Sequence, residues 1–364
     1  MVLTSVLAFG LAGGCAAYLD LRSSAAVSDV DALLRGEDRP EFPENPDDPF
    51  ADQALNILVM GTDYRGGGNA AIAGEGHEFH SDSTMLIHVA GDRSRVEVVA
   101  IPRDSLVDIP ACPLPGGGQS APRRNAVFNS AFAIGGGSGR DITGAAACTI
   151  LTVEHNTGVT ITDHVVVMME GLVGVVEALG GVPVDLPEPV RGDHHVDLDL
   201  PAGEQVLDGH QAINFLRARG GSGMGLEMGS DLARIERQQV FVDAMLEAIL
   251  GQNVITEAPT LFRTADAVLS SISTGPRLAS ARSAAGLAWS LRDVRPSHIV
   301  FTPLPIMDAP QDSNRVAWVQ PQARQLWERI AAGEPPAELV EYEDAQQAGD
   351  GAEATSDDAG ASDG

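Results

Sequence analysis

Lysine is absent from this chain of 364 residues, and all 23 of its basic side chains are arginine. A nucleotide-binding P-loop needs a lysine that reaches the β- and γ-phosphates, so the absence excludes that motif. The glycine runs of the chain therefore indicate loops and not phosphate cradles. These runs are Gly66–Gly68, Gly116–Gly118 and Gly135–Gly137.

Positive charge is scarce overall, because 51 acidic residues oppose 23 basic ones and the formal net charge is -28. Nucleic-acid affinity depends chiefly on cationic contacts with phosphates, so the balance argues against DNA or RNA as a partner. It argues equally against a transcriptional regulator. Arginines that cluster in so acidic a chain indicate a small polyanionic ligand instead.

Charged side chains are missing from the N-terminal run Val2 to Leu19. As a helix this run would be ~27 Å long, close to the thickness of a bilayer core. We expect residues 1–20 to form a single-pass signal anchor in the cell membrane, with the following domain outside the cytoplasm. A cleaved signal peptide, a lipidated Cys15 in the weak lipobox LAGGC and a buried helix are the alternatives, and no basic residue precedes the run.

Cysteines are few as well, and Cys112 and Cys148 are the two outside the N-terminal run. Four closely spaced ligands are absent around them, so they do not indicate a zinc site. In an exported domain an even pair predicts a disulfide, and two buried thiols are the alternative.

Composition divides the chain into four parts. Residues 21–52 are rich in proline, aspartate and glutamate, which favours an extended linker. Residues 341–364 contain almost no large apolar side chains, so we expect a disordered acidic tail. Residues 53–340 are left for one folded domain that carries the function.

Within this domain, short apolar runs alternate with segments of helical periodicity. Strands are expected at Ala54–Met60, Thr84–Ala90, Val96–Ile101, His164–Met169 and Ile299–Thr302. Helices are expected at Asp141–Asn156, Gly171–Leu179, Asp208–Arg217 and Ser230–Leu250, with Asp208 as a helix N-cap. This alternation predicts a layered α/β domain.

Five short charged segments each adjoin the end of an apolar run. They are Asn56–Arg65, Ser81–Met85, Ile101–Ser105, Phe215–Arg219 and Asp231–Gln239. Ligands of α/β sheets bind at strand ends, so these segments are expected to meet on one edge of the sheet.

The side chains of the five segments suit a metal-bridged pyrophosphate. Asp63, Asp82 and Asp104 offer the hard oxygen ligands that Mg²⁺ or Mn²⁺ prefers. Arginine presents a planar fork that binds phosphate with two hydrogen bonds. For any one segment a surface ion pair is the plain alternative, but five together favour a ligand site.

Helical geometry places three further polar side chains together. Asp231, Arg234 and Gln238 lie on one face of the last predicted helix, and Phe241 and Met245 continue that face. A pocket with a polar mouth and an apolar interior would suit a ligand with a charged head and a lipid tail. An ordinary amphipathic helix with an ion pair explains the same spacing.

Two other groups of polar residues carry less weight. The run Asp193-His194-His195 lacks a matched third metal ligand, so a solvated loop is the simpler interpretation. Ser105 and the serines beside Asp82 lack the Gly-x-Ser-x-Gly context of a hydrolase nucleophile.

Seven motifs in order resemble the LytR-CpsA-Psr family of cell-wall glycopolymer ligases, over residues 56 to 250. The motifs are NILVMGTDYR, SDSTM, IPRDS, RRNAVFNSAFAIGG, LGGVPVD, LDGHQAINFLRAR and DLARIERQQ. The resemblance implies a three-layer α-β-α sandwich with a central mixed sheet. It also implies transfer of a glycopolymer from a polyprenyl-pyrophosphate carrier to peptidoglycan.

The resemblance also implies roles for individual residues. By motif position, Asp63 and Asp82 would hold the metal, while Asp82, Arg103 and Asp104 would form the catalytic group at the pyrophosphate. The residues that would grip or orient the phosphates are Arg103, Arg217, Arg219, Asp231, Arg234 and Gln238. One position departs from the family, because His80 stands where an arginine usually precedes the Ser-Asp pair. This change weakens one phosphate contact or makes it pH-dependent.

The sequence thus predicts a metal-dependent phosphotransferase whose partners are a lipid-linked glycan, peptidoglycan and the membrane. Two other functions use the same residues. A polyprenyl-pyrophosphate pyrophosphatase would use water as the acceptor, and a non-catalytic lipid-carrier binding protein would hold the pyrophosphate without transfer.

Overall fold

The structure is a computed structural model. It describes residues 26–34, 50, 53–62, 79–194, 196–218, 220–228, 237, 240, 241, 243–245, 247, 248, 269, 272–279, 281–292 and 294–336.

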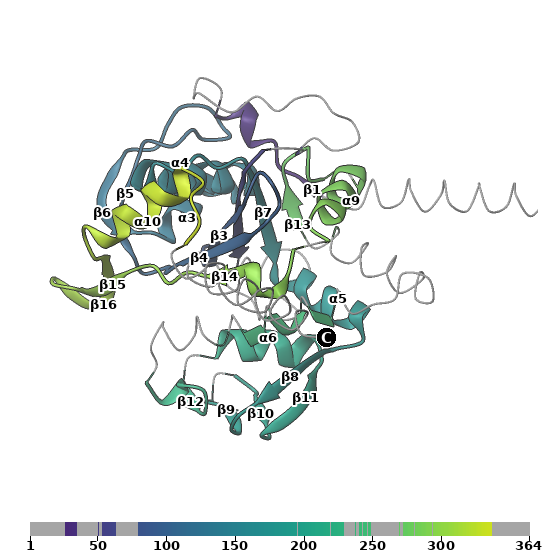
Figure 1. Ribbon diagram of the computed structural model, residues 1–364. Helices are drawn as coiled ribbons and strands as arrows, with labels where there is room; N and C mark the ends of the chain where they lie inside the picture. The colour runs from purple at the N-terminus through teal and green to yellow at the C-terminus, as the bar shows by residue number, and fades with distance from the viewer. Residues whose placement is uncertain are drawn as a thin grey trace, which may run out of the picture.

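A seven-stranded mixed sheet forms the centre of the fold (Figure 1). In spatial order its strands are β1 (Ala26–Val27), β13 (Ile272–Thr274), β7 (Asp163–Met168), β2 (Leu55–Thr62), β3 (Ser81–Val89), β4 (Val96–Ile101) and β14 (Ile299–Phe301). The middle strand β2 is parallel to β7 and antiparallel to β3, and β4 is antiparallel to β3 and parallel to β14. The predicted mixed sheet is confirmed.

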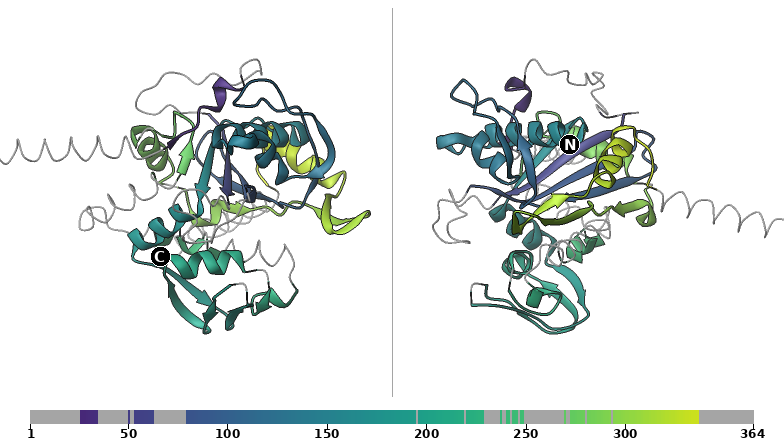
Figure 2. Two further views of the ribbon diagram at one scale, coloured as in Figure 1. Left: turned by 180° about the vertical axis from the view of Figure 1, so that it is seen from behind. Right: turned by 90° about the vertical axis from the view of Figure 1, so that its left-hand side faces the viewer.

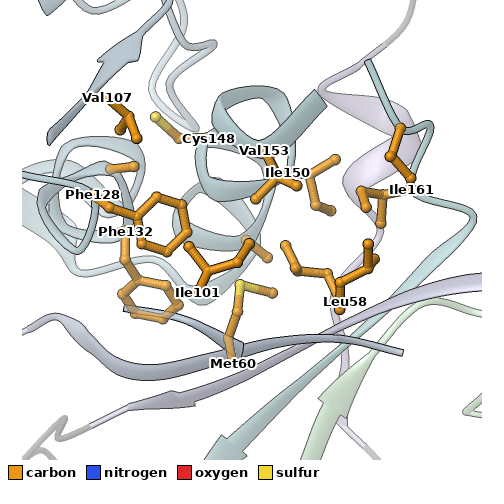
Figure 3. Close-up of a cluster of buried hydrophobic side chains, with 14 of the residues drawn as sticks. Leu58, Met60, Ile101, Val107, Phe128, Phe132, Cys148, Ile150, Val153 and Ile161 are labelled. Carbon is orange, nitrogen blue, oxygen red and sulfur yellow. The ribbon is translucent and has the colours of Figure 1, made fainter. Parts of the chain in front are cut away.

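Helices cover both faces of this sheet because β2 alternates between two apolar clusters. Leu58 and Met60 face the main cluster, which lies under α3 (Ser130–Gly136), α4 (Ile142–Thr157) and α10 (Gln322–Ala331). Ile57 faces a smaller cluster that includes Leu287 of α9 (Ala281–Ser290). Figure 3 shows Met60 and Leu58 pointing from the sheet toward α4 in the main cluster. Three layers result, as predicted.

Short hydrogen-bonded caps and a disulfide fix α4 in place. Asp141 is its N-cap and accepts from the backbone of Gly144, and Gly158 ends the helix at a φ of 71°. The Cys112–Cys148 disulfide joins α4 to the segment that follows β5 (Leu106–Ile109), so the predicted pairing is present. β5 in turn pairs with β6 (Arg123–Val127).

A second apolar cluster lies beside the sheet, around α5 (Met169–Leu179) and α6 (Gly209–Arg217) (Figure 2). Short strands complete this part of the chain: β8 (Val182–Leu186), β9 (Val190–Gly192), β10 (Asp199–Leu200), β11 (Gly203–Leu207) and β12 (Gly221–Ser222). Asp208 caps α6 through a capping box with Gln211, which confirms the predicted N-cap. α5 follows β7 directly, so this cluster adjoins the end of the sheet at which β7 terminates.

The C-terminal part adds a hairpin of β15 (Ile306–Ala309) and β16 (Asp312–Trp318). The remaining short helices are η1 (Val30–Ala32), η2 (Gly137–Gly139), η3 (Leu226–Met228) and η4 (Pro296–His298).

Part of the predicted linker packs against the domain. Residues 26–34 contain β1, which pairs with β13, and Val30 and Leu34 are buried in the main cluster. Ser28 Oγ lies 2.7 Å from Nε2 of the buried His164. Apolar side chains in an otherwise polar segment explain why this stretch joins the fold.

No helix within the described part of the chain is both long enough and apolar enough to span a bilayer. The predicted membrane segment, residues 1–20, lies outside the described residues.

Candidate functional site

Three of the predicted site residues meet at one end of the central sheet, along the edge that the strand ends form. Arg103 and Asp104 follow the end of β4, and Asp82 is the second residue of β3. Thr84 of β3 lies opposite Ile101 of β4, so the start of one antiparallel strand and the end of the other share this edge. Asp82 thus lies at the beginning of its strand, and Arg103 and Asp104 lie after the end of theirs.

Arg103 bridges the two carboxylates. Its Nη1 donates to Oδ1 of Asp82 at 2.6 Å, and its Nε donates to Oδ2 of Asp104 at 3.1 Å. The three side chains are partly buried, with exposed fractions of 19% for Arg103, 31% for Asp82 and 13% for Asp104. Partial burial lowers the local dielectric constant and so strengthens each ion pair.

The backbone around this group is held at several points. Ser105 N donates to Pro102 O at 3.0 Å, which closes a turn over Arg103 and Asp104. Asn129 N donates to Arg103 O at 3.1 Å, and Phe128 N donates to Ser105 O at 2.8 Å. The turn after β4 is therefore tied to the segment that leads into α3.

A second arginine, which sequence reasoning missed, completes the group. Arg315 of β16 pairs through Nη1 with Oδ1 of Asp104, so each oxygen of Asp104 faces its own guanidinium. The sequence around Arg315 matches none of the family motifs. Its only signal is the polar start of the strand, DSNR in DSNRVAW. Together Asp82, Arg103, Asp104 and Arg315 form an alternating chain of charges.

The strand that leads to Asp63 ends at the same edge. Thr62 is the last residue of β2, and it lies opposite Ser81 of β3 and Met168 of β7. Asp63 itself lies outside the described residues, as do Arg219, Asp231, Arg234 and Gln238.

Arg217 is the last residue of α6, where a cationic side chain complements the helix dipole. α6 packs against α5, which begins directly after β7 ends at the site edge. The phosphate-binding role of Arg217, which the family resemblance implies, stays a prediction.

Arg237 is a further residue that sequence reasoning did not single out. Its guanidinium is buried and donates to Ala218 O at 2.6 Å and to Met224 O at 2.9 Å. These bonds tie the backbone at Ala218 and at Met224 to the same side chain. Phe241, an apolar residue on the face that continues from Gln238, is buried in the second apolar cluster with Phe215.

The donor chemistry at the edge fits a hard divalent cation. Asp82 and Asp104 supply carboxylate oxygens. Both carboxylates also pair with the Arg103 guanidinium, whose positive charge would compete with a cation. No group of three or more His, Cys, Asp or Glu side chains that could hold a metal occurs among the residues that the structure describes. The predicted metal ligand Asp63 lies outside those residues.

A separate small cavity lies at the opposite end of the strands, where β7 begins. It has a volume of ≈ 20 Å³ and is lined by Asp163, His164 and Arg277 among others. Burial raises the pKa of Asp163 to about 6, and Arg277 Nε lies 3.6 Å from its Oδ2. The residues of the sequence motifs lie at the edge with Arg103, so that edge is the candidate site.

Comparison with known proteins gives a family match that spans most of the chain. The profile of the LytR_cpsA_psr family matches residues 18–332. Cell wall biosynthesis protein LcpA of Corynebacterium glutamicum is 29% identical over 242 residues, which is 61% of this chain and 45% of that protein. Polyisoprenyl-teichoic acid–peptidoglycan teichoic acid transferase TagU of Oceanobacillus iheyensis is 29% identical over 206 residues, or 56% of this chain and 54% of that protein. The chain thus spans about half the length of these curated relatives.

Solved structures share the fold at lower identity. The LytR-Csp2A-Psr enzyme of Actinomyces oris superposes with a TM-score of 0.57 at 20% identity, covering 84% of this chain and 96% of its own. TagT bound to LIIa-WTA gives a TM-score of 0.54 at 20% identity, with 83% and 98% covered. At this identity the likeness establishes the shared fold.

Proposed function

Because the chain belongs to the LytR-CpsA-Psr family, we propose that it transfers a cell-wall glycopolymer from a polyprenyl-pyrophosphate carrier to a sugar hydroxyl of peptidoglycan. The observation that carries the proposal is the charged group at the sheet edge, in which Arg103 joins Asp82 and Asp104. The name of the TagU relative, a teichoic acid–peptidoglycan transferase, supports the reaction class.

The reaction replaces the phosphoanhydride bond of the pyrophosphate with a phosphate ester bond. The hydroxyl oxygen of the acceptor sugar attacks the phosphorus that carries the glycopolymer. The bond from that phosphorus to the bridging oxygen breaks, and polyprenyl monophosphate leaves with the bond's electron pair. A phosphodiester then joins polymer to wall, and the hydroxyl proton passes to water or to one of the aspartates.

The contribution of the protein is mostly electrostatic and positional, as in other phosphoryl transfers. Arg103 would stabilise negative charge that develops on the phosphoryl oxygens, and the two aspartates keep its guanidinium in a fixed orientation before the substrate binds. Preorganised donors act strongly in a partly buried site, since they need no rearrangement during the reaction.

A divalent cation, Mg²⁺ or Mn²⁺, completes the proposed site. Asp63 and Asp82 would hold it, and the cation would offset charge on the oxygens of the pyrophosphate. The shared edge of β2 and β3, where Thr62 lies opposite Ser81, supports this pairing. The remaining phosphate contacts are proposed for Arg217 together with Arg219, Asp231, Arg234 and Gln238.

A lipid-linked substrate requires a site close to a membrane. We therefore place the domain outside the cytoplasm, held at the cell membrane by residues 1–20. The relatives named as cell-wall proteins support this location.

The proposal is tested with a purified chain, Mg²⁺, a lipid-pyrophosphate glycan and peptidoglycan oligomers. Loss of the central guanidinium in Arg103→Ala should lower the transfer rate by about 10²- to 10³-fold, as removal of one preorganised donor does in other enzymes. Arg191→Ala removes an arginine from an exposed ion pair with Asp199 and should leave the rate unchanged. Equal rates for wild type and Arg103→Ala would contradict the proposal.

The same assay separates the two rival functions. Release of polyprenyl monophosphate and glycan phosphate that does not require peptidoglycan would indicate a pyrophosphatase. Tight binding of the lipid pyrophosphate without turnover, unaffected by Asp82→Ala, would indicate a carrier-binding protein.

A further inference from the structure

We infer that Arg315 is a positioning residue for the transfer reaction and that the β15–β16 hairpin completes the site. The inference rests on the proposed function for its catalytic consequence. Its structural content, a fixed orientation of Arg103 through Asp104, can be tested without any substrate.

The hairpin is attached to the very turn that carries the site. Val316 N donates to Asp104 O at 3.2 Å, and Ser105 and Val316 form a parallel bridge. Trp318 Nε1 donates to Ser105 Oγ at 3.1 Å. These contacts place β16 alongside residues 104 and 105. Arg315 directly precedes Val316 on β16.

The core end of the hairpin is anchored. Trp318 packs against the main apolar cluster, and its ring centroid lies 5.7 Å from that of the buried Trp327 in α10. Ile306 of β15 packs on the same cluster. Figure 1 shows the tip of the hairpin projecting from the domain. The opposite end, with Ile306 and Trp318, is anchored in the core and contacts the turn at Ser105.

Arg315 gives Asp104 a second charged partner. With Arg103 on Oδ2 and Arg315 on Oδ1, the carboxylate cannot rotate without breaking one of two ion pairs. Asp104 is largely buried, so an oxygen without a partner would be destabilised. Arg103 depends on this fixed carboxylate for its Nε contact, and Arg315 therefore acts on Arg103 through Asp104.

The positioning is measured directly through the Nε–Hε group of Arg103. In a chain labelled with ¹⁵N at arginine Nε, the Arg103 signal is the one lost in Arg103→Ala. We expect its Hε to exchange with water about tenfold faster in Arg315→Ala, as loosening of one charge-assisted hydrogen bond predicts. Unchanged exchange would overturn the inference whatever reaction the protein catalyses.

A double-mutant cycle then tests the route through Asp104. Arg315→Ala should lower the transfer rate by about 10-fold or more, and Arg315→Lys should lose less because it keeps one donor. In an Asp104→Asn background Arg315→Ala should have little further effect, whereas two independent roles would multiply. Multiplying effects would overturn the inference.

The matched control is Arg324→Ala, which removes an arginine from an exposed pair with Glu328 on α10. It should change neither the rate nor the Arg103 signal. Thermal unfolding of each variant separates lost positioning from lost folding. If the wild type shows no transfer, the proposed function fails, while the exchange measurement still decides the role of Arg315.

Discussion

Asp163 is a buried carboxylate outside the site, and its pKa makes a prediction about stability. Burial raises this pKa from its ordinary value of 3.8 to about 6. The folded state therefore binds the proton more tightly than the unfolded state, and stability is lost as the pH rises through about 6. Asp163→Asn should stabilise the fold by about 1–3 kcal/mol at pH 8, at roughly 1.4 kcal/mol per pKa unit.

That gain should vanish below about pH 4, where Asp163 is protonated in both states. Urea unfolding at the two pH values measures the difference. Asp308→Asn, at an exposed position of β15, controls for the substitution itself. A gain that is equal at both pH values would show that ionisation of Asp163 is not its cause.

Individual residues of the site could be predicted from sequence where a motif adjoined a strand end. Arg103 and Asp104 follow an apolar run, and that run became β4. Arg315 could not be predicted this way, because its role depends on the bridge between Val316 and Ser105, more than 200 positions apart in the chain. Long-range pairing of this kind leaves no local pattern.

At the scale of elements, α3 and α4 cross in close contact where two glycines meet. A Cβ at Gly135 would lie 2.1 Å from Gly144 O and 2.5 Å from Cys148 Cβ. Gly135→Ala should therefore destabilise the fold by about 1–3 kcal/mol, the usual effect of overpacking a tight contact. Chemical denaturation measures it.

Gly139→Ala is the matched control, because nothing lies within 4 Å of a Cβ at that position. It should leave stability almost unchanged. Equal stability of both variants would mean that the helix crossing can relax and that the glycines are not required there.

Elements were predictable where periodicity was strong. The helix expected at Asp141–Asn156 is α4 at Ile142–Thr157, and the strand expected at Val96–Ile101 is β4 with the same bounds. β1 was missed, because two residues in a polar segment carry no strand signal. Its pairing with β13 depends on the sheet edge that the rest of the chain provides.

At the scale of the whole molecule, residues 26–34 belong to the folded domain. A chain that begins at residue 35 would lose Val30 and Leu34 from the main cluster and the Ser28 partner of His164. We expect a loss of about 3–6 kcal/mol relative to a chain that begins at Ala26, from two buried apolar side chains and one buried hydrogen bond. Equilibrium unfolding of the two chains measures the loss. Equal stability would mean that the segment only rests on the surface.

The architecture as a whole followed from the alternation of strands and helices together with seven family motifs. The motifs carried the functional hypothesis further than composition could, because carboxylates and arginines at strand ends have many structural explanations. The β15–β16 hairpin contains none of the motifs, so the ion pair of Arg315 with Asp104 could be found only in the structure.

The most direct test of the proposed function is the identity of the phosphorus products. Wild-type protein with Mg²⁺, a lipid-pyrophosphate glycan and peptidoglycan oligomers is followed by ³¹P nuclear magnetic resonance and mass spectrometry. We expect a phosphodiester between glycan and peptidoglycan sugar, formed in equal amount with polyprenyl monophosphate and only when the acceptor is present. Polyprenyl monophosphate that accumulates without the phosphodiester, or no product at all, would contradict a transferase.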